Sequence, residues 1–383
     1  MNGKNRIFSN NFLILVISLF FMEFIRGMFV LGYVPMLPTK YFNISLLTTS
    51  IIMAIHFTAD ALTNFVIGIF LKRINSKVII NFGFILIIIS FIFMSFFPKN
   101  ILILIATSIV LGISASPIWV IVLSNIGIEN RGKKMGIVYF NWMIGLLFGM
   151  ASINLIFSFL SLKTPILITI VSIFSFFIFQ FYKGTRLSSS QSKLKFKKLI
   201  KLTYFYSNLI PGIIIQAISI SSLVPILPKF AINYLRIDNF LYTSYLIIGI
   251  IFCSFSMLYL SKFIDKLKRE KSFMLSGFLI FGISILSLAL ITNTYLILVI
   301  TIVIGLIYGV ILPMWNKYMA SFVSDQHREE SWGLFNSIQG LGSLVGMPIG
   351  GILTKITNNI VSPFYFAGIL IIILVLIYLK RKD

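Results

Sequence analysis

Long apolar runs recur along the whole of this sequence, and they leave few folds open to it. Twelve such runs lie near residues 11–37, 44–71, 78–97, 101–124, 135–160, 164–183, 203–228, 240–261, 272–292, 295–322, 331–354 and 360–379. A helix needs roughly 20 residues to cross a bilayer. Apolar residues make up 58% of the chain and charged residues 11%, against about 25% charged in an ordinary soluble domain. This composition excludes a soluble enzyme and predicts an all-α integral membrane protein of about twelve transmembrane helices.

The basic residues are distributed unevenly between the predicted loops. A net charge of +22 could suggest a nucleic-acid partner, but the charge follows the predicted topology. With the N-terminus inside, the inner segments hold Lys4, Arg6, Lys72, Arg73, Lys77, Arg131, Lys133, Lys134, the 183–201 stretch, the 262–271 loop and Lys380, Arg381 and Lys382. The outer loops hold only Lys40, Lys99, Lys163, Lys229, Arg236 and Lys355. By the positive-inside rule we expect both termini in the cytoplasm, the bilayer as partner, and no nucleic acid.

The chain repeats itself on either side of a polar stretch. The repeated segments are 34–38 with 224–228, Pro117-Ile118-Trp119 with Pro313-Met314-Trp315, and the glycines 136, 145 and 149 with 333, 342 and 346. Their offsets are 190, 196 and 197 residues, so one register with small insertions relates them all. We therefore predict two six-helix halves, 1–182 and 203–383, joined by a basic cytoplasmic linker at 183–202 with a short amphipathic helix. This is the plan of the major facilitator superfamily.

Two loops resemble the superfamily's signature after its second and eighth helices, which usually reads Gly-x-x-x-Asp-Arg-x-Gly-Arg. The first copy runs from Gly68 to Lys77 and has Lys72 in place of the acid. The second keeps Asp265 but has Ser261 in place of the glycine. The signature therefore supports the superfamily only together with the repeat.

Ionisable residues inside apolar spans are costly, and they mark function by default. Here they are Glu23 and Arg26, His56 and Asp60, and Lys317. The spacings i,i+3 and i,i+4 place each of the first two pairs on one helix face, where its members can neutralise each other. One interpretation is a set of structural salt bridges. The other is proton coupling through Glu23 and Asp60, tuned by Arg26, with His56 as either a relay or a hydrogen-bonded spacer.

Two tryptophans lie deep in apolar spans, away from the interfacial belt where this residue is usual. Trp119 and Trp142, with Asn141 and Asn64 nearby on the polar faces, provide flat apolar surfaces beside hydrogen-bonding groups. Such a combination is typical of a sugar site, although tryptophans that only fill the core remain an alternative. The second half offers only Gln216, Gln339, Asn316, serines and Lys317. One polar and one apolar wall favour an amphiphile with a polar head and hydrocarbon tails.

At these residues the chain resembles the flippases of Gram-positive bacteria that move the glycolipid anchor of lipoteichoic acid. The resemblance covers nearly the whole chain. It is carried by residues 21–28, 56–68, 116–121, 131–133, 139–140, 312–316 and 332–340.

The resemblance implies a proton-coupled antiporter of the bacterial plasma membrane that moves a diglucosyl-diacylglycerol from the inner to the outer leaflet. It implies a headgroup pocket that includes Glu23, Arg26, Asp60, Trp119 and Trp142, and an apolar pocket for acyl chains in the second half. Lys72, with its neighbour Arg73, would serve as a headgroup contact or gate at the cytoplasmic end. The proton motive force would drive transport without a cofactor. Enzymes of envelope glycolipid synthesis are a candidate class of protein partner.

Two other functions remain open from the residues. A multidrug or metabolite efflux carrier would share the fold, the carboxyl groups and the apolar half. A scaffold or receptor for envelope-synthesis enzymes would have no use for intramembrane carboxyl groups. The single cysteine, Cys253, excludes a disulfide framework and a cysteine metal site. No nucleotide-binding loop or nucleophile-base arrangement is present, so we do not expect an enzyme.

Overall fold

In the computed structural model, the regular elements are helices throughout the described ranges, which are residues 10–38, 44–124, 131–184, 203–260, 270–323 and 328–380. The first part of the chain forms α1 (Asn10–Arg26), η1 (Gly27–Tyr33), α2 (Val34–Met36), α3 (Leu46–Arg73), α4 (Ser76–Phe96), α5 (Ile101–Ser124), α6 (Arg131–Leu160), η2 (Ser161–Lys163) and α7 (Thr164–Phe179). The second part forms α9 (Ile210–Leu223), α10 (Leu227–Lys229), η3 (Phe230–Tyr234), α11 (Asn239–Phe255), η4 (Ser256–Leu260), α13 (Glu270–Leu290), α14 (Thr294–Ser321), α15 (Arg328–Thr357) and α16 (Ser362–Leu379).

The helices agree with the apolar runs of the sequence. Within the described part of the chain, nine helices are long and apolar enough to cross a membrane. A tenth candidate span is the pair Ile210–Leu223 and Leu227–Tyr234, which is bent by 43°. Two shorter apolar helices, Thr164–Phe179 and Asn239–Phe255, complete the series. The predicted all-α membrane fold is confirmed.

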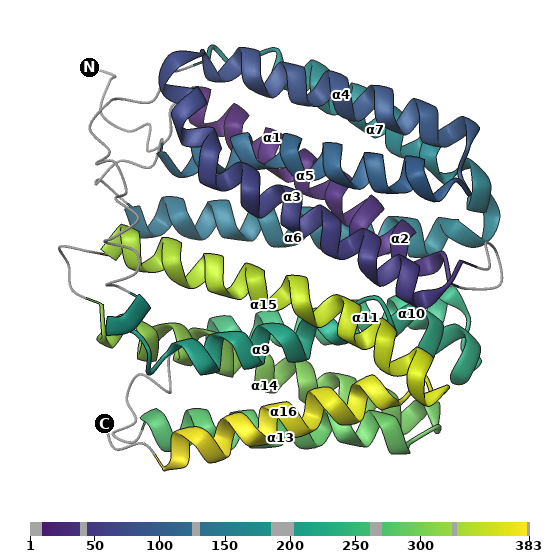
Figure 1. The fold of residues 1–383 in the computed structure, drawn as a ribbon, viewed down its shortest axis with the longest axis vertical. Helices are drawn as coiled ribbons and strands as arrows, with labels where there is room; N and C mark the ends of the chain where they lie inside the picture. Colours follow the sequence, from purple (N-terminus) through teal and green to yellow (C-terminus); the bar gives the residue numbers. More distant parts are fainter. Residues whose placement is uncertain are drawn as a thin grey trace. The chain divides into compact units, whose positions relative to one another are not determined.

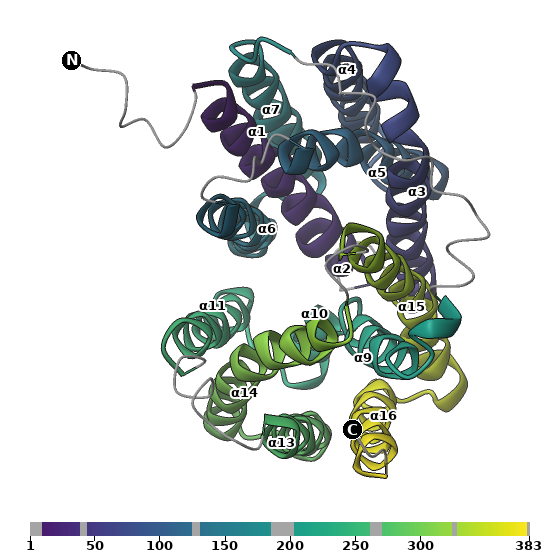
Figure 2. The same cartoon turned by 90° about the vertical axis from the view of Figure 1, so that its left-hand side faces the viewer.

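The chain divides into two compact units. Unit 1 consists of Met1–Asn43 and Ile52–Ser192, and unit 2 consists of Ile44–Ile51 and Lys193–Asp383. Within unit 1, α1 packs against α6, α7 and α5, and α4 packs against α5 and α7. Within unit 2, the corresponding helices make four of these five pairs: α9 packs against α15 and α16, and α13 packs against α14 and α16. Figure 1 shows the helices of each unit running alongside one another. Figure 2 shows α7 between α1 and α4, and α14 between α11 and α13.

The first helix of each unit is irregular near its repeated prolines. Proline has no backbone N–H and cannot continue a regular helix. In unit 1, a π-helical segment, Gly27–Tyr33, precedes Pro35. In unit 2, the helix bends between Leu223 and Leu227, and a π-helical segment follows. The same motif therefore accompanies an irregularity in both helices, a π-helical segment within the continuous helix Asn10–Met36 and a bend in the second.

The repeated glycines let paired helices approach closely in both units. A Cβ at Gly145 would lie 2.6 Å from the carbonyl oxygen of Phe20 in α1, and one at Gly149 would meet the carbonyl of Phe24. In unit 2, a Cβ at Gly342 would lie 2.7 Å from Cβ of Ala217 in α9. The α1–α6 contact matters for function because α1 carries Glu23 and Arg26.

We expect Gly149→Ala to lower the free energy of unfolding by about 1–3 kcal/mol, because the added methyl group would overlap backbone that cannot move away. Gly340→Ala is the matched control, since a Cβ at Gly340 would meet nothing within 4 Å. That variant should unfold at or above the wild-type temperature, because alanine is the better helix former. Thermal unfolding of both purified variants in detergent checks the difference, and equal losses would contradict it.

Several sequence predictions concern residues outside the described ranges. They include the amphipathic helix of the 183–202 linker, most of the inner basic residues, and the signature-like loop with Asp265. The cytoplasmic placement of both termini therefore stays a prediction.

Candidate functional site

The site begins with two charged side chains on α1 of unit 1. Glu23 is fully buried, and Arg26 is 7% exposed. Arg26 Nη1 donates to Glu23 Oε1 at 3.0 Å. The i,i+3 spacing brings these groups together along one helix face, so the predicted pairing of Glu23 with Arg26 is confirmed. A buried ion pair of this kind needs further hydrogen-bonding partners, because both charges have left water.

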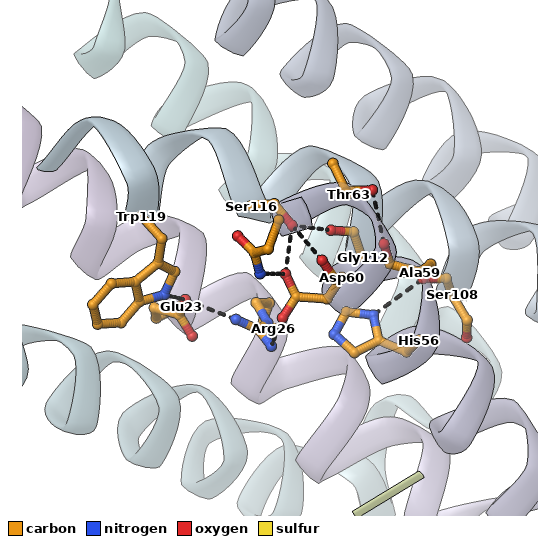
Figure 3. A network of polar contacts seen from close by, with 11 residues as sticks. Glu23, Arg26, His56, Ala59, Asp60, Thr63, Ser108, Gly112, Ser116 and Trp119 are labelled. Carbon is orange, nitrogen blue, oxygen red and sulfur yellow. Dashed lines mark hydrogen bonds and ion pairs between the residues drawn. The ribbon is translucent and has the colours of Figure 1, made fainter. Parts of the chain in front are cut away.

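Arg26 also reaches the next helix in the chain. Its Nη2 atom lies 3.4 Å from Oδ2 of Asp60 on α3. The Asp60 side chain is only 17% exposed. One guanidinium thus bridges two carboxylates that are 37 residues apart in the sequence, and Figure 3 shows it lying between them. The planar fork of arginine is suited to this, because it presents several N–H groups in one plane.

The third wall of the site comes from α5. Trp119 Nε1 donates to Glu23 Oε1 at 2.7 Å, on the same oxygen that Arg26 contacts. Ser116 Oγ lies 2.5 Å from Asp60 Oδ1. Asn64, one turn beyond Asp60 on α3, donates to the same Oδ1 at 3.1 Å. Both carboxyl groups therefore receive an arginine N–H and at least one further donor, the arrangement that stabilises an ionised carboxylate.

A glycine brings α3 and α5 close enough for these contacts. A Cβ at Gly112 would lie 2.6 Å from the carbonyl oxygen of His56 and 3.0 Å from the backbone nitrogen of Asp60. Ser116 follows Gly112 by one helical turn and is fully buried. The close backbone approach therefore places the Ser116 hydroxyl at the carboxylate.

The predicted pairing of His56 with Asp60 is wrong. His56 Nδ1 lies 3.1 Å from the backbone carbonyl oxygen of Ser108. Because a carbonyl only accepts, this contact assigns the ring proton to Nδ1. Nε2 is buried and has no hydrogen-bond partner among the described residues. Asp60 instead contacts Arg26 and Asn64, so the i,i+4 spacing of His56 and Asp60 did not make them hydrogen-bond partners.

The remaining predicted headgroup residues occupy α6. The ring of Trp142 packs edge-on against Trp119, with 6.1 Å between the centroids. Asn141 donates to the carbonyl of Ile137 in its own helix at 2.8 Å. Trp142 is therefore joined to the cluster through Trp119, whereas the hydrogen bond given for the Asn141 amide is to its own helix.

The predicted cytoplasmic pair lies far along α3 from this cluster. Lys72 and Arg73 are the last two residues of that helix, and Arg73 is exposed. At about 1.5 Å per residue, Arg73 is roughly 20 Å from Asp60 along the helix. The two groups of predicted site residues on α3 therefore stand at different depths.

Buried charge is confined to unit 1 in the part of the chain that the structure describes. There, the buried acidic, basic and histidine side chains are Glu23, Arg26 and His56. The buried polar residues of unit 2 are neutral ones, chiefly serines such as Ser219 and Ser222 that bond to carbonyls of their own helix. Lys317 is exposed and lies four residues before the end of α14. This places the lysine near a helix end.

This chain is similar to known proteins over nearly its whole length. The family model for the Major Facilitator Superfamily matches residues 15–272 and again 209–383. The chain is 42% identical over 381 residues to the proton-coupled antiporter flippase LtaA of Staphylococcus epidermidis, covering 98% of this chain and 96% of the relative. The protein of the same name from Staphylococcus aureus is 41% identical over 372 residues, covering 96% and 94%. The chain belongs to the LtaA family of the major facilitator superfamily.

Solved structures of other members show the same fold. The nucleoside transporter NupG aligns with a TM-score of 0.76 at 14% identity, over 98% of this chain and all of that one. The POT family transporter PepTSo aligns with a TM-score of 0.72 at 10% identity, over 98% of both chains. The predicted family is confirmed, and so is the predicted class of protein, a transporter rather than an enzyme.

In this LtaA-family member, the cluster of Glu23, Arg26 and Asp60 contains two acidic side chains and one basic side chain. Glu23 and Asp60 together carry one more negative charge than Arg26 can neutralise when all three are ionised. Glu23 Oε2 is buried and has no hydrogen-bond partner among the described residues. A buried, unsatisfied carboxylate oxygen is costly. Uptake of one proton by either carboxyl group would make the three side chains neutral as a set.

The sequence interpretation predicted Trp119 of α5 but missed the part played by the small residues of that helix. Small residues recur there every four positions. Ser108 presents its backbone carbonyl to α3, Gly112 presents an open surface, and Ser116 presents its hydroxyl group. This spacing was readable as a stripe of small residues on one helix face. Such stripes usually signal close helix packing, however, and the identity of the facing helix was not contained in the pattern.

The hydrogen bond from Trp119 to Glu23 can be tested separately from the packing of the Trp119 ring. We expect Trp119→Phe to lower the free energy of unfolding by about 1.5–3 kcal/mol, because a buried carboxylate loses a charge-assisted hydrogen bond. Trp142→Phe is the comparison, since it keeps the Trp119–Glu23 bond while it alters the ring contact. Thermal unfolding of the two variants measures the difference. Equal losses would mean that the indole acts through packing alone.

Proposed function

We propose that this protein is a proton-coupled antiporter flippase that moves a diglucosyl-diacylglycerol, the anchor of lipoteichoic acid, from the inner to the outer leaflet. Identity of 41–42% over nearly the full chain to relatives named proton-coupled antiporter flippase LtaA is the observation that carries the proposal. The buried charges of unit 1 and the neutral interior of unit 2 support it independently, because a glycolipid has one polar and one apolar end.

In this proposal, the Glu23–Arg26–Asp60 cluster is the proton site and the polar wall of the headgroup pocket. Sugar hydroxyl groups are both donors and acceptors, so they can exchange with the donors that now hold the two carboxylates. The rings of Trp119 and Trp142 provide apolar faces on which a pyranose can stack. Lys72 and Arg73 would contact the headgroup or gate its entry at the cytoplasmic end, with both termini on that side of the plasma membrane.

Proton uptake and headgroup binding would compete for the same carboxyl groups. A proton on Glu23 or Asp60 removes the charge that attracts Arg26, and it weakens the hydrogen bonds from Trp119 or Ser116. A headgroup that needs the ionised carboxylates therefore binds poorly while the proton is bound. Such mutual exclusion is the thermodynamic requirement of an antiporter. The proton motive force would supply the energy, without a bound cofactor.

A reconstitution assay tests the proposal. Purified protein in liposomes should move a fluorescent diglucosyl-diacylglycerol between leaflets, and an imposed proton gradient should accelerate the movement. A fluorescent diacylglycerol without sugars is the control lipid, because it lacks the disaccharide that the polar cluster would bind. Protein-free liposomes give the background rate. Pumping of hydrophobic cations with no glycolipid movement would reject the flippase in favour of an efflux carrier.

A further inference from the structure

The Ser116 hydroxyl lies among three acceptors at once. From its Oγ atom, Asp60 Oδ1 is at 2.5 Å, the Asp60 carbonyl oxygen at 3.0 Å and the Gly112 carbonyl oxygen at 3.2 Å. A hydroxyl has one hydrogen to donate and two lone pairs to accept with. Ser116 can thus donate its hydrogen to only one of the three at a time. A change of partner requires rotation of the hydroxyl hydrogen and no movement of heavy atoms.

The two protonation states of Asp60 place different demands on its neighbours. The ionised carboxylate only accepts, so Arg26, Asn64 and Ser116 can all donate to it. The protonated carboxyl group has a hydrogen of its own to donate, and its pull on the guanidinium is gone. Arg26 has no acceptor and cannot respond to this change. Ser116 can, because its oxygen accepts from the carboxyl group while its hydrogen turns to the carbonyl of Gly112.

We propose that Ser116 is a positioning residue that keeps Asp60 attached to α5 in both protonation states, so that proton uptake releases only the Arg26–Asp60 contact between α1 and α3. This inference rests on the proposed role of Asp60 as a proton site. It assigns α3 and α5 to one rigid pair and makes the Arg26–Asp60 ion pair between α1 and α3 the contact that the proton breaks.

The surroundings of Asp60 support this division. The groups that face Asp60 are Arg26 from α1, Asn64 from its own helix and Ser116 from α5, and Glu23 stands beyond Arg26. His56, one turn before Asp60 on α3, interacts with it electrostatically. The α3–α5 contact has two further attachments that do not depend on the Asp60 proton. They are the close backbone approach at Gly112 and the bond from His56 to the Ser108 carbonyl. Between α1 and α3, Arg26 forms the ion pair with Asp60. Its guanidinium carbon also lies over the ring of Phe57 on α3, 5.9 Å from the centroid, and this contact does not depend on the Asp60 charge.

Infrared difference spectroscopy of the purified protein tests the proposal without any substrate. The carboxyl C=O band is followed while pH is varied, and its Asp60 component is identified as the part lost in Asp60→Asn. Ser116→Ala should move the midpoint of that component to higher pH by about half to one unit, because the ionised form loses the stronger of the two hydrogen bonds. Ser116→Thr keeps the hydroxyl and should restore the wild-type midpoint.

Ser114→Ala is the matched control. Ser114 lies on the same helix and is 2% exposed, and its hydroxyl has no hydrogen-bond partner among the described residues. In Ser114→Ala, the midpoint of the Asp60 component should equal that of the wild type. A wild-type midpoint in folded Ser116→Ala, or an equal shift in Ser114→Ala, would overturn the proposal. If Ser116→Ala does not fold, Ser116→Cys replaces it. Its weaker donor should give a smaller shift in the same direction, and no shift would again overturn the proposal.

This titration and the flipping assay can fail separately. A shifted midpoint in protein that moves no glycolipid would reject the proposed function and leave the role of Ser116 standing. Glycolipid movement with an unshifted midpoint would reject the role of Ser116 alone.

Discussion

Arg26→Ala is expected to lower the free energy of unfolding by about 3–5 kcal/mol at neutral pH, the range found when one partner of a buried ion pair is removed. Glu23 and Asp60 would then lie close together with no cation between them. The loss should shrink as pH falls, because protonation of either carboxyl group removes the repulsion. Chemical or thermal unfolding in detergent, measured over a series of pH values, checks both the size and the direction.

A charge-free version of the cluster separates stability from coupling. The triple variant Arg26→Met, Glu23→Gln and Asp60→Asn removes all three charges together. It should recover most of the stability, because replacing a whole buried ion network is often neutral, unlike breaking it. It should also show no response to a proton gradient. If Arg26→Ala alone unfolds at the wild-type midpoint, the cluster is not the buried network described above.

Asp60→Asn is expected to abolish the acceleration of flipping by a proton gradient while leaving the protein folded. The amide cannot take up a proton, and its oxygen keeps the acceptor for Ser116 at nearly the same position. Glu23→Gln should have the same effect if the proton is shared between the two carboxyl groups. Flipping rates measured in liposomes, with and without an imposed gradient, should become equal in these variants.

Asp238→Asn is the matched control for that experiment. Asp238 caps the N-terminus of α11 by accepting from the backbone N–H of Leu241 at 2.7 Å. Asparagine caps helices as well as aspartate does, so the same chemical change should cost little there. Full gradient dependence in both Glu23→Gln and Asp60→Asn would exclude proton coupling through this cluster.

The fold was largely predictable from the sequence because lipid imposes a simple rule. A chain in a bilayer must satisfy its backbone hydrogen bonds internally, so each long apolar run has to become a helix. The Pro and Gly matches at one offset indicated the duplication, and four pairs of packed helices recur in both units. The different irregularities before Pro35 and after Leu223 were not predictable. They depend on packing around each proline rather than on the proline itself.

The candidate site was predictable only where its partners share a helix. Glu23 and Arg26 are three residues apart, and helix geometry alone brings them together. The same reasoning failed for His56, because spacing permits a contact with Asp60 without excluding a better one. The facing helix supplied that partner in the Ser108 carbonyl.

The sequence by itself determined that this chain spans a membrane, that it contains a duplication, and that all but one of its intramembrane charges, Lys317, lie in the first half. These properties follow from composition and local periodicity, which any stretch of chain carries with it. Only the tertiary structure decided which charges meet. Arg26 and Asp60 are 34 residues apart, Ser116 and Asp60 are 56 apart, and Trp119 and Glu23 are 96 apart. Contacts over such separations depend on how α1, α3 and α5 pack, and a glycine at position 112 sets how closely two of those helices approach.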